Sequence, residues 1–330
     1  MNEIEVILDL GSKVLDGKYI DQQEAQQLVN IKKENLLFLL AMADQIRQKF
    51  DGDEVDLCAI INARSGKCSE NCKYCAQSKY HDTDVAVYPF ITIHEIIKKA
   101  EEAEKHGANH FAIVTSGKGM EGDKEFPKII EAIKQIRKKT KLKVCCSLGA
   151  LTDGTAKALK DAGVTRYHHN IETSKKNYSN ICTTHTYESR IDTIKIAQKF
   201  GLEVCSGGIL GMNETMQDRI DMAFEIRDLN VHSIPLNILM PIKGTPFENK
   251  EKLNTLEILK IFALFKFIAP KCKIRTAGGR EVNLGDLQAN ALLSGLSGMM
   301  IGGYLTTGGR NYENDEQMLK ALGRRRKYEG

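Results

Sequence analysis

The stretch TIHEIIKKAEEAEKHGANHFAIVTS, residues 92–116, contains the repeating unit that decides the fold. Its first part carries apolar residues at helical spacing and stops at Gly107, and a glycine after the last periodic residue commonly ends a helix. Its second part, HFAIVTS, is a short apolar and β-branched run of the kind found in strands. The stretch therefore predicts a helix that leads directly into a strand.

The same unit recurs along most of the chain. Short apolar runs alternate with longer segments of helical period, which favours a parallel sheet whose strands are joined by helices. The eight strand candidates are residues 54–64, 110–116, 142–149, 165–173, 202–211, 233–242, 271–279 and 298–307. The seven helical segments are residues 92–108, 126–140, 153–163, 186–201, 215–230, 255–270 and 284–295.

Eight such units in a chain of 330 residues predict an α/β fold, a closed (β/α)8 barrel of the TIM type. An open, doubly wound sheet is the alternative. Residues 1–50 have helical character and precede the first strand candidate. Because no Pro/Gly/Ser-rich linker divides the rest of the chain, we expect an N-terminal helical extension at 1–50 and a single barrel domain at 51–330.

The composition narrows the class of protein. A balance of 47 Lys and Arg against 43 Asp and Glu is too even to indicate a nucleic-acid partner, and we interpret the one basic run, Arg324 to Lys327, as a solvated end. The first ten residues lack the pattern of a secretory signal, and the most apolar window, 261–270, contains Lys266 and is too short to span a bilayer. Nine cysteines, an odd number, fit metal or redox chemistry in a reducing compartment. We therefore expect a cytoplasmic protein with no membrane or nucleic-acid partner.

A run of three cysteines follows the first strand candidate. In ARSGKCSENCKYCAQSKY, residues 63–80, Cys68, Cys72 and Cys75 have the spacing C-x-x-x-C-x-x-C. A structural zinc site uses four protein ligands, and catalytic zinc with three prefers His or carboxylate among them. A four-iron cluster normally has four thiolates, so three would leave one iron open to another ligand. The motif therefore indicates an iron-sulfur cluster with a vacancy, with zinc or inert thiols as alternatives.

A barrel places its chemistry at the C-terminal ends of its strands. Polar and cysteine residues do fall on or just after the strand candidates, namely Cys58, Cys145, Asn170, Glu172, Cys205, Asn237, Arg275, Thr306 and Thr307. Alternation along a strand lets Asn170 and Glu172 face the same way. It makes Cys145 and Cys146 face opposite ways, so only one of that pair can enter the barrel.

The cysteine run, with Tyr74 just before its last cysteine, resembles the radical S-adenosylmethionine (SAM) superfamily. Further stretches resemble the biotin synthase family in order along the chain: YHHNIETS, TTHTYESRIDT, VCSGGILGMNET, PLNILMPIKGTP and AGGRE. The resemblance implies that Cys68, Cys72 and Cys75 hold a [4Fe-4S] cluster whose open iron binds SAM. Reductive cleavage of SAM would yield a 5′-deoxyadenosyl radical, which removes hydrogen from two unactivated carbons of dethiobiotin so that sulfur can be inserted. Such C–H bonds offer nothing to an acid–base pair, so a cofactor must supply the radical.

The resemblance also implies roles for single residues. Tyr74, Ser116, Gly117, Asn170, Glu172 and Arg190 would contact SAM, and Asn170 would contact substrate as well. Glu172 stands where the family has Asp, one methylene shorter, which puts its reach in doubt. Asn237 would bind the ureido ring, and the backbone of Thr306 and Thr307 the substrate carboxylate. Without the resemblance to the family, a purely structural role is equally plausible, with the Asn residues as turn formers and the Thr residues as β-strand formers.

The glycines of SGKGMEG, residues 116–122, also fit the dinucleotide-binding pattern G-x-G-x-x-G. That motif needs a prompt helix and an acidic residue ending the next strand. Here residues 123–127 delay the helix and the next strand candidate ends in VCCS. We therefore interpret this loop as backbone that lines the methionine part of SAM.

The sulfur source is where the chain departs from its relatives. In the best-known biotin synthases, three barrel cysteines and an arginine hold an auxiliary [2Fe-2S] cluster that supplies the sulfur. By resemblance, Cys145, Cys205 and Arg275 match three of these catalytic ligands, but the position of the third cysteine is Ala112. Cys58 is an additional thiol on the first strand candidate.

We hypothesise that Cys58 replaces the missing ligand and shifts the auxiliary cluster toward four irons. The alternative is that Cys58 is a buried core cysteine, a common fate of free thiols. We interpret the remaining cysteines, Cys146, Cys182 and Cys272, as structural. The resemblance further implies a flavodoxin- or ferredoxin-type electron donor and a homodimer.

Two other classes of function stay open at this point. One is another radical SAM enzyme of the same branch, similar to methylornithine synthase or to a hydrogenase maturase. Cys145, Cys205 and Asn237 speak against it. The other is a non-catalytic iron-sulfur carrier. A carrier would not need a barrel interior lined by polar side chains, which argues against this class.

Overall fold

The computed structural model of the chain describes residues 2–304 and 308–326. Its strands are β1 (Glu54–Arg64), β2 (His110–Thr115), β3 (Lys143–Ser147), β4 (Arg166–His168), β5 (Glu203–Cys205), β6 (Gly208–Leu210), β7 (Ser233–Ile238), β8 (Lys273–Thr276), β9 (Gly298–Met300) and β10 (Arg325–Arg326). Its α-helices are α1 (Glu3–Leu15), α2 (Gln22–Val29), α3 (Leu36–Asp51), α4 (Ile93–Lys105), α5 (Phe126–Lys139), α6 (Asp153–Ala162), α7 (Lys175–Tyr178), α8 (Tyr187–Lys199), α9 (Met216–Asp228), α10 (Thr255–Ile268), α11 (Arg280–Leu284), α12 (Gln288–Leu292) and α13 (Tyr312–Ala321). Short 3-10 turns lie at Lys33–Asn35 and Gly285–Leu287.

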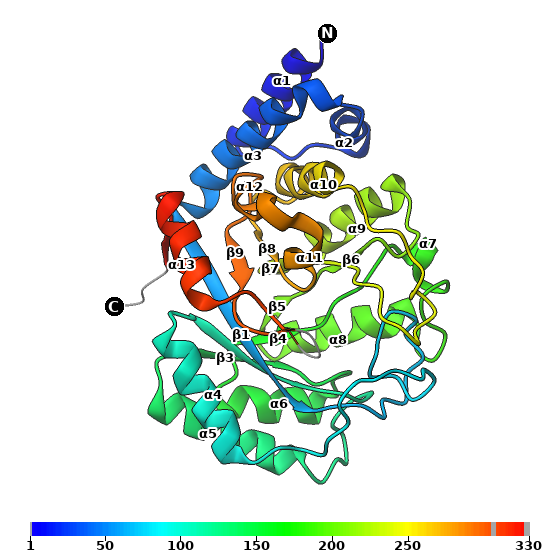
Figure 1. Cartoon of the computed structure of the whole chain (residues 1–330), viewed down its shortest axis with the longest axis vertical. Helices are drawn as coiled ribbons and strands as arrows, with labels where there is room; N and C mark the ends of the chain where they lie inside the picture. The colour runs from blue at the N-terminus through cyan, green and yellow to red at the C-terminus, as the bar shows by residue number, and fades with distance from the viewer. Residues whose placement is uncertain (1, 305–307, 327–330) are drawn as a thin grey trace.

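The strands form a closed parallel barrel (Figure 1). The order runs from β1 through β2, β3, β4, β5, β7 and β8 to β9, and β9 pairs with β1 to close the ring. The prediction of a (β/α)8 barrel is confirmed, and the open sheet is wrong. Closure gathers the C-terminal ends of all the strands around one opening, which we call the mouth.

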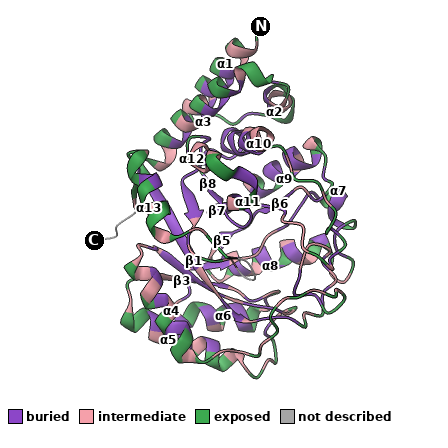
Figure 2. Ribbon diagram, viewed as in Figure 1, coloured by how far each residue is buried: buried purple, intermediate pink, exposed green. Residues whose placement is uncertain are grey.

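The helices form where amphipathic periods and caps coincide. At the start of α4, Thr92 and Glu95 form a reciprocal capping box, and the buried face of the helix is made by Ile96, Ile97 and Ala100. α10 differs because it is buried nearly all round (Figure 2). It packs against α2 and α3 of the segment that precedes the barrel, and Lys266 within it pairs with Asp51 at 2.6 Å.

Two predicted elements are broken in the structure. The strand candidate 202–211 is two short strands, β5 and β6, separated by Ser206 and Gly207. At Gly207 a Cβ would collide with the backbone of Pro235 in β7, so this close approach requires glycine. The helical segment 284–295 is interrupted at Gly285, whose φ of +49° ends α11.

The C-terminal segment was not predicted to be ordered. After α13, the short strand β10 pairs with the start of β1. Arg324 is buried and donates to the carbonyls of Asp53, Leu292 and Leu296. The interpretation of this basic run as a solvated end is therefore wrong for Arg324, because its guanidinium satisfies carbonyls that would otherwise be left buried and unpaired. Within the described residues, no helix has the length and apolarity needed to cross a bilayer.

Candidate active site

The mouth of the barrel holds a cavity of about 490 Å³. Cys68, Cys72 and Cys75 line it together, and no fourth cysteine does so within the part of the chain that the structure describes. Cys72 is buried, whereas Cys68 and Cys75 are partly exposed. The loop that carries them is fixed by its own backbone, since Cys68 exchanges hydrogen bonds of 2.9 Å with Gln77 and Lys79. Burial raises the pKa of the Cys75 thiol to about 11, so a metal must displace its proton.

Asn170, Glu172 and Arg190 meet on one wall of this cavity. Arg190 Nη1 donates to the Asn170 carbonyl oxygen at 2.9 Å and lies 3.5 Å from Glu172 Oε1. Although burial acts to lower it, the negative charge of Glu172 and its neighbours raises the pKa of Arg190, so the guanidinium stays charged. The wall therefore presents a fixed cation beside carboxylate and amide oxygens.

Asn170 and Glu172 do face the same cavity, but not by alternation along a strand, because β4 ends at His168. Glu172 instead has a left-handed backbone with φ of +71°. Its N–H donates to the Gly207 carbonyl at 3.1 Å, and its carbonyl accepts from Ile209 at 2.9 Å. A non-glycine residue in this conformation is held against a cost of about 1–3 kcal/mol, and such residues cluster at functional sites.

Another part of the cavity wall is the glycine-containing loop after β2. Ser116, Gly117 and Lys118 line the cavity. The Arg64 guanidinium donates to the Ser116 carbonyl through Nε at 3.1 Å and Nη2 at 2.8 Å, and pairs with Asp123 at 2.6 Å. Gly117 has φ of +127°, which a side chain would disfavour. The loop thus presents backbone to the cavity.

Asn237 and Tyr74 lie where the mouth cavity adjoins an apolar pocket of about 110 Å³. The Asn237 amide donates to the Gly208 carbonyl at 3.2 Å and accepts from the Gly278 N–H at 2.9 Å. Ile209, Ile238 and Leu239 are among the apolar residues of this pocket. Thr306 and Thr307, which the sequence assigns to the substrate carboxylate, lie outside the described residues.

A second group of thiols lies deeper in the barrel. Cys58, Cys205 and Arg275 line a chamber of about 100 Å³ that shares His168, Asn170 and Asn237 with the mouth cavity. Cys145 is beside it, because it lies on the same face of β3 as Ser147, which lines the chamber. Burial raises the pKa of Cys58 to about 12 and that of Cys145 well above the usual range. We call this group, with its cavity, the deep chamber.

Strand register places Cys58 relative to the missing cysteine. Ala112 pairs with Ile60 on β1 and with Cys145 on β3. Cys58 pairs with His110, so it lies one inward-facing position from Ile60, toward the closed end. The neighbouring Cys146 is fully buried in the hydrophobic core outside the barrel, as alternation predicted for one of the pair.

Charged residues beneath the deep chamber were not predicted from the sequence. Asp56 is 1% exposed and accepts from His110 Nδ1 and Arg275 Nη2, both at 2.7 Å. Arg166 Nη1 lies 3.4 Å from the same carboxylate. Burial alone would raise the pKa of Asp56, but these cations, Arg275 first, hold it well below its usual range. The sequence feature that could have indicated this buried ion-pair network is Asp56, an acidic residue two positions before Cys58 and therefore on the same inward face of β1.

Two nitrogens remain available around this chamber. Among the described residues, Arg275 Nη1 and His168 Nε2 are buried without a hydrogen-bond partner. Buried polar atoms are rarely left unpaired unless a ligand, ion or water completes them. Together with the thiols, they fit a group that coordinates to sulfur and accepts hydrogen bonds.

Comparisons with known proteins agree with this geometry. Residues 63–226 match the radical SAM superfamily, and residues 235–325 match the Biotin and Thiamin Synthesis associated domain. Biotin synthase of Carboxydothermus hydrogenoformans is 50% identical over 318 residues, 96% of this chain and 98% of that protein. Biotin synthase of Acetivibrio thermocellus is 50% identical over 315 residues, 95% of this chain and 97% of that protein.

Solved structures match at lower identity. Methylornithine synthase superposes with a TM-score of 0.85 at 18% identity, covering 97% of both chains. The [FeFe]-hydrogenase maturase HydG gives a TM-score of 0.84 at 18% identity, covering 99% of this chain and 76% of HydG. At this identity, the likeness establishes the barrel fold only.

Proposed function

Since the chain belongs to the biotin synthase family of the radical SAM superfamily, we propose that its two adjoining cavities together convert dethiobiotin to biotin. The chain is a radical SAM enzyme of the sulfur-inserting kind. One observation carries the assignment of residues: a three-cysteine cavity adjoins a thiol-lined chamber through the shared residues His168, Asn170 and Asn237. Substrate at this junction is within reach of both.

The mouth cysteines Cys68, Cys72 and Cys75 would hold the [4Fe-4S] cluster. When bound, this cluster and SAM supply radical chemistry at unactivated carbons, and an auxiliary iron-sulfur cluster supplies the sulfur. The lack of a fourth cysteine in the described lining supports a site that keeps one position open for SAM. Tyr74 lines both this cavity and the apolar pocket, so it would contact bound SAM at their boundary.

The polar wall would bind the rest of SAM. The Asn170 amide and the Glu172 carboxylate can accept hydrogen bonds from ribose hydroxyls. The Arg190 guanidinium holds the Asn170 backbone carbonyl at 2.9 Å and contacts Glu172, and the Gly207 N–H holds the Asn170 amide oxygen at 3.1 Å. Ser116 and Gly117 offer backbone groups on the wall formed by the loop after β2. The fixed side chains of one wall and the backbone of the other would orient the bound molecule before reaction.

Substrate would lie between the two cavities. Among the residues that the structure describes, Asn237 is the one side-chain amide that lines the mouth cavity, the apolar pocket and the deep chamber. It is therefore suited to bind the ureido ring. The apolar pocket suits the aliphatic chain of dethiobiotin. The roles of the backbone of Thr306 and Thr307 stay predictions, because these residues lie outside the described range.

The deep chamber would hold the auxiliary cluster. We propose Cys58, Cys145, Cys205 and Arg275 as its ligands, with Cys58 in place of the cysteine that is missing at Ala112. The support is that Cys58, Cys205 and Arg275 line one chamber, that Cys145 lies on the same face of β3 as Ser147 in the chamber wall, and that among the described residues Arg275 Nη1 has no hydrogen-bond partner. Asp56 holds the other end of the guanidinium and so orients it. A four-iron composition is part of this proposal.

The experiment that tests the whole proposal is anaerobic reconstitution followed by Mössbauer counting of both clusters and product analysis from dethiobiotin. Wild-type chain should contain two clusters and form biotin. Cys58→Ser should lose auxiliary iron and sulfide while keeping the mouth cluster. Cys146→Ser, which changes a buried thiol outside the barrel, is the matched control and should keep both. Unchanged auxiliary content in Cys58→Ser would remove Cys58 from the ligand set.

Several properties remain predictions. They are a flavodoxin- or ferredoxin-type electron donor, a homodimer, a cytoplasmic location, and the division into a helical extension at 1–50 and one barrel domain at 51–330. Reduction of the reconstituted chain by each donor type and analytical ultracentrifugation would test the first two.

A further inference from the structure

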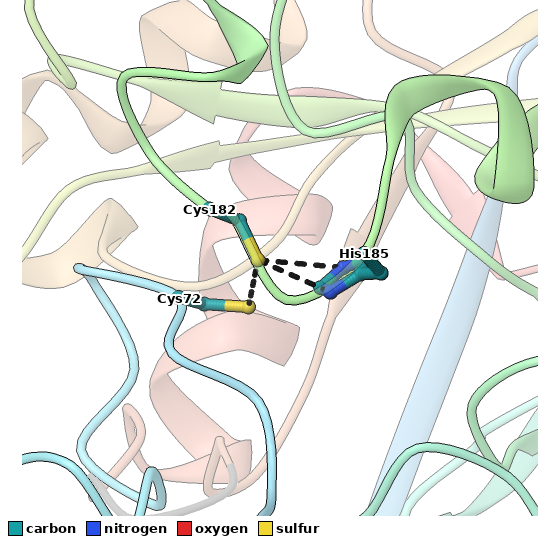
Figure 3. A group of neighbouring side chains, drawn as sticks. All are labelled: Cys72, Cys182 and His185. Atoms are coloured by element: carbon teal, nitrogen blue, oxygen red, sulfur yellow. Dashed lines mark hydrogen bonds between the residues drawn. The ribbon is translucent and has the colours of Figure 1, made fainter.

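A third group of metal-binding side chains lies where the cysteine loop meets the loop before α8, and it includes Cys72 and His185 of the mouth cavity wall (Figure 3). Cys182 Sγ is 3.7 Å from Cys72 Sγ, and it lies 3.1 Å from Nδ1 and 3.8 Å from Nε2 of His185. Cys182 and His185 belong to the loop between α7 and α8, far from Cys72 in sequence. From the sequence, Cys182 is expected to be structural and no role is predicted for His185.

The spacing of these atoms suits a single tetrahedral cation. Zinc–thiolate bonds of about 2.3 Å place two sulfurs about 3.8 Å apart, and a zinc–imidazole bond of about 2.0–2.1 Å places nitrogen about 3.6 Å from sulfur. The Cys72–Cys182 distance is 3.7 Å, and the two ring nitrogens of His185 lie on either side of the expected value. All three ligand atoms lie within 4.8 Å of one another. A cation would fit with small movements and keep a fourth position open.

The two segments are bound tightly to each other. The Asn71 side-chain oxygen accepts from the backbone N–H of Thr183 at 2.9 Å and of Thr184 at 3.2 Å, and its amide donates to Thr183 Oγ1 at 2.6 Å. The Lys73 N–H donates to the Ile181 carbonyl at 2.9 Å. The ligands are therefore held near one another in the cluster-free chain, which lowers the entropy cost of binding.

The surroundings of His185 match those of a metal ligand. Its Nδ1 is 2.7 Å from a Glu70 carboxylate oxygen, the contact that metal-bound histidines commonly make with their second nitrogen. Arg190 Nη2 donates to Nε2 at 2.9 Å, and a cation bound there would replace this one contact. Arg190 would still be held by the Tyr178 hydroxyl at 2.5 Å and by the Asn170 carbonyl at 2.9 Å.

We propose that Cys72, Cys182 and His185 form a mononuclear site for a divalent cation of the Zn²⁺ and Fe²⁺ class in the chain that lacks its clusters. Binding releases one proton from each thiol that is protonated and changes no oxidation state. Two sulfurs and an imidazole are ligands that suit these cations. Because Cys72 is shared, a cation here and a cluster on the cysteine loop exclude each other. Only this exclusion rests on the proposed function; the cation site rests on the three side chains.

The probe is Co²⁺, titrated anaerobically into the full-length, cluster-free chain in the presence of a phosphine reductant. We expect one equivalent to bind with thiolate-to-cobalt charge transfer and the visible bands of tetrahedral cobalt. Cys182→Ser, His185→Gln and Cys72→Ser should each weaken binding at least about tenfold. Cys68→Ser and Cys75→Ser should bind as the wild type does, as should Cys272→Ser, the matched buried-thiol control.

The outcome that overturns the site is the reverse pattern, in which Cys68→Ser and Cys75→Ser lose cobalt and Cys182→Ser keeps it. That result would assign the metal to the cysteine loop alone. A second arm tests exclusion: one equivalent of Zn²⁺ added before iron and sulfide should slow formation of the mouth cluster in the wild type and not in His185→Gln. Equal rates with and without Zn²⁺ would overturn the exclusion while the cobalt result still decides the site. Neither arm requires biotin formation, so a failure of the proposed function is recognised separately.

Discussion

The mouth cavity and the deep chamber both present cysteine thiols, but they support them in different ways. Cys68 and Cys75 lie on an irregular loop and are partly exposed, and their loop is held by backbone hydrogen bonds. Cys58, Cys145 and Cys205 lie on strands, fully buried, above the ion pairs of Asp56. The mouth can therefore change without disturbing the barrel, whereas the deep chamber is part of the barrel's own core. Substitutions in the two regions should separate activity from stability.

The largest effect on activity should come from a substitution at the mouth. Cys68→Ser should lower the rate of reductive SAM cleavage at least about 1,000-fold, because loss of this ligand would prevent assembly of the [4Fe-4S] cluster on which the reaction depends. Since Cys68 is partly exposed on a loop, the free energy of unfolding of the cluster-free chain should change by less than about 0.5 kcal/mol. The measurements are 5′-deoxyadenosine formation and urea denaturation. A large loss of stability would show that the loop belongs to the core after all.

The deep chamber should show the opposite pattern. Asp56→Asn should lower the free energy of unfolding of the cluster-free chain by about 3–5 kcal/mol, because Arg275 would lose the carboxylate with which it is paired and stay buried as a cation, whereas Arg166 keeps its ion pair with Glu203. Chemical denaturation of the unloaded chain checks this without any cluster present. Asp228→Asn, at an exposed ion pair on α9, is the control and should stay within about 1 kcal/mol. A stability change as small as the control's would contradict the idea that this network supports the barrel.

A smaller effect should come from the wall between the two regions. Arg190→Lys should raise the KM for SAM about tenfold, because a lysine cannot reproduce the guanidinium's fork of bonds to Tyr178, Asn170 and His185. SAM cleavage measured across SAM concentrations separates KM from kcat. Arg227→Lys, on α9 away from the cavity, should leave KM unchanged. An unchanged KM in Arg190→Lys would mean that Glu172 and Asn170 keep their positions without it.

The barrel could be predicted from the sequence because its signal is repeated. Each helix–strand unit carries its own caps and periods, so that errors at 202–211 and 284–295 left the topology intact. Both errors arose at glycines, Gly207 and Gly285, where tertiary contact or backbone conformation overrides a local apolar pattern. The three-cysteine site at the mouth could also be predicted from the sequence, because its cysteines are close to one another in the chain.

What the sequence did not reveal depends on contacts between distant segments. Asp56 meets Arg275 and Arg166 only after the barrel closes, and Cys182 meets Cys72 only after the loop before α8 folds back. Glu172 lines the cavity, as predicted, but it does so through a left-handed backbone conformation and not through the alternation of side chains along a strand. Alternation along a strand predicts which side a residue faces, but not which residue of another strand it meets there.

The smallest expected effect separates two adjacent cysteines on β3. Cys145 faces the deep chamber, whereas Cys146 is packed in the hydrophobic core on the other side of the strand. Cys146→Ala removes one buried sulfur and should cost about 1 kcal/mol of unfolding free energy, while iron content, sulfide content and biotin yield stay at wild-type values. Cys145→Ala should instead lose auxiliary iron. Denaturation and metal analysis of the two variants side by side check this, and loss of iron in Cys146→Ala would mean that β3 presents the other face to the chamber.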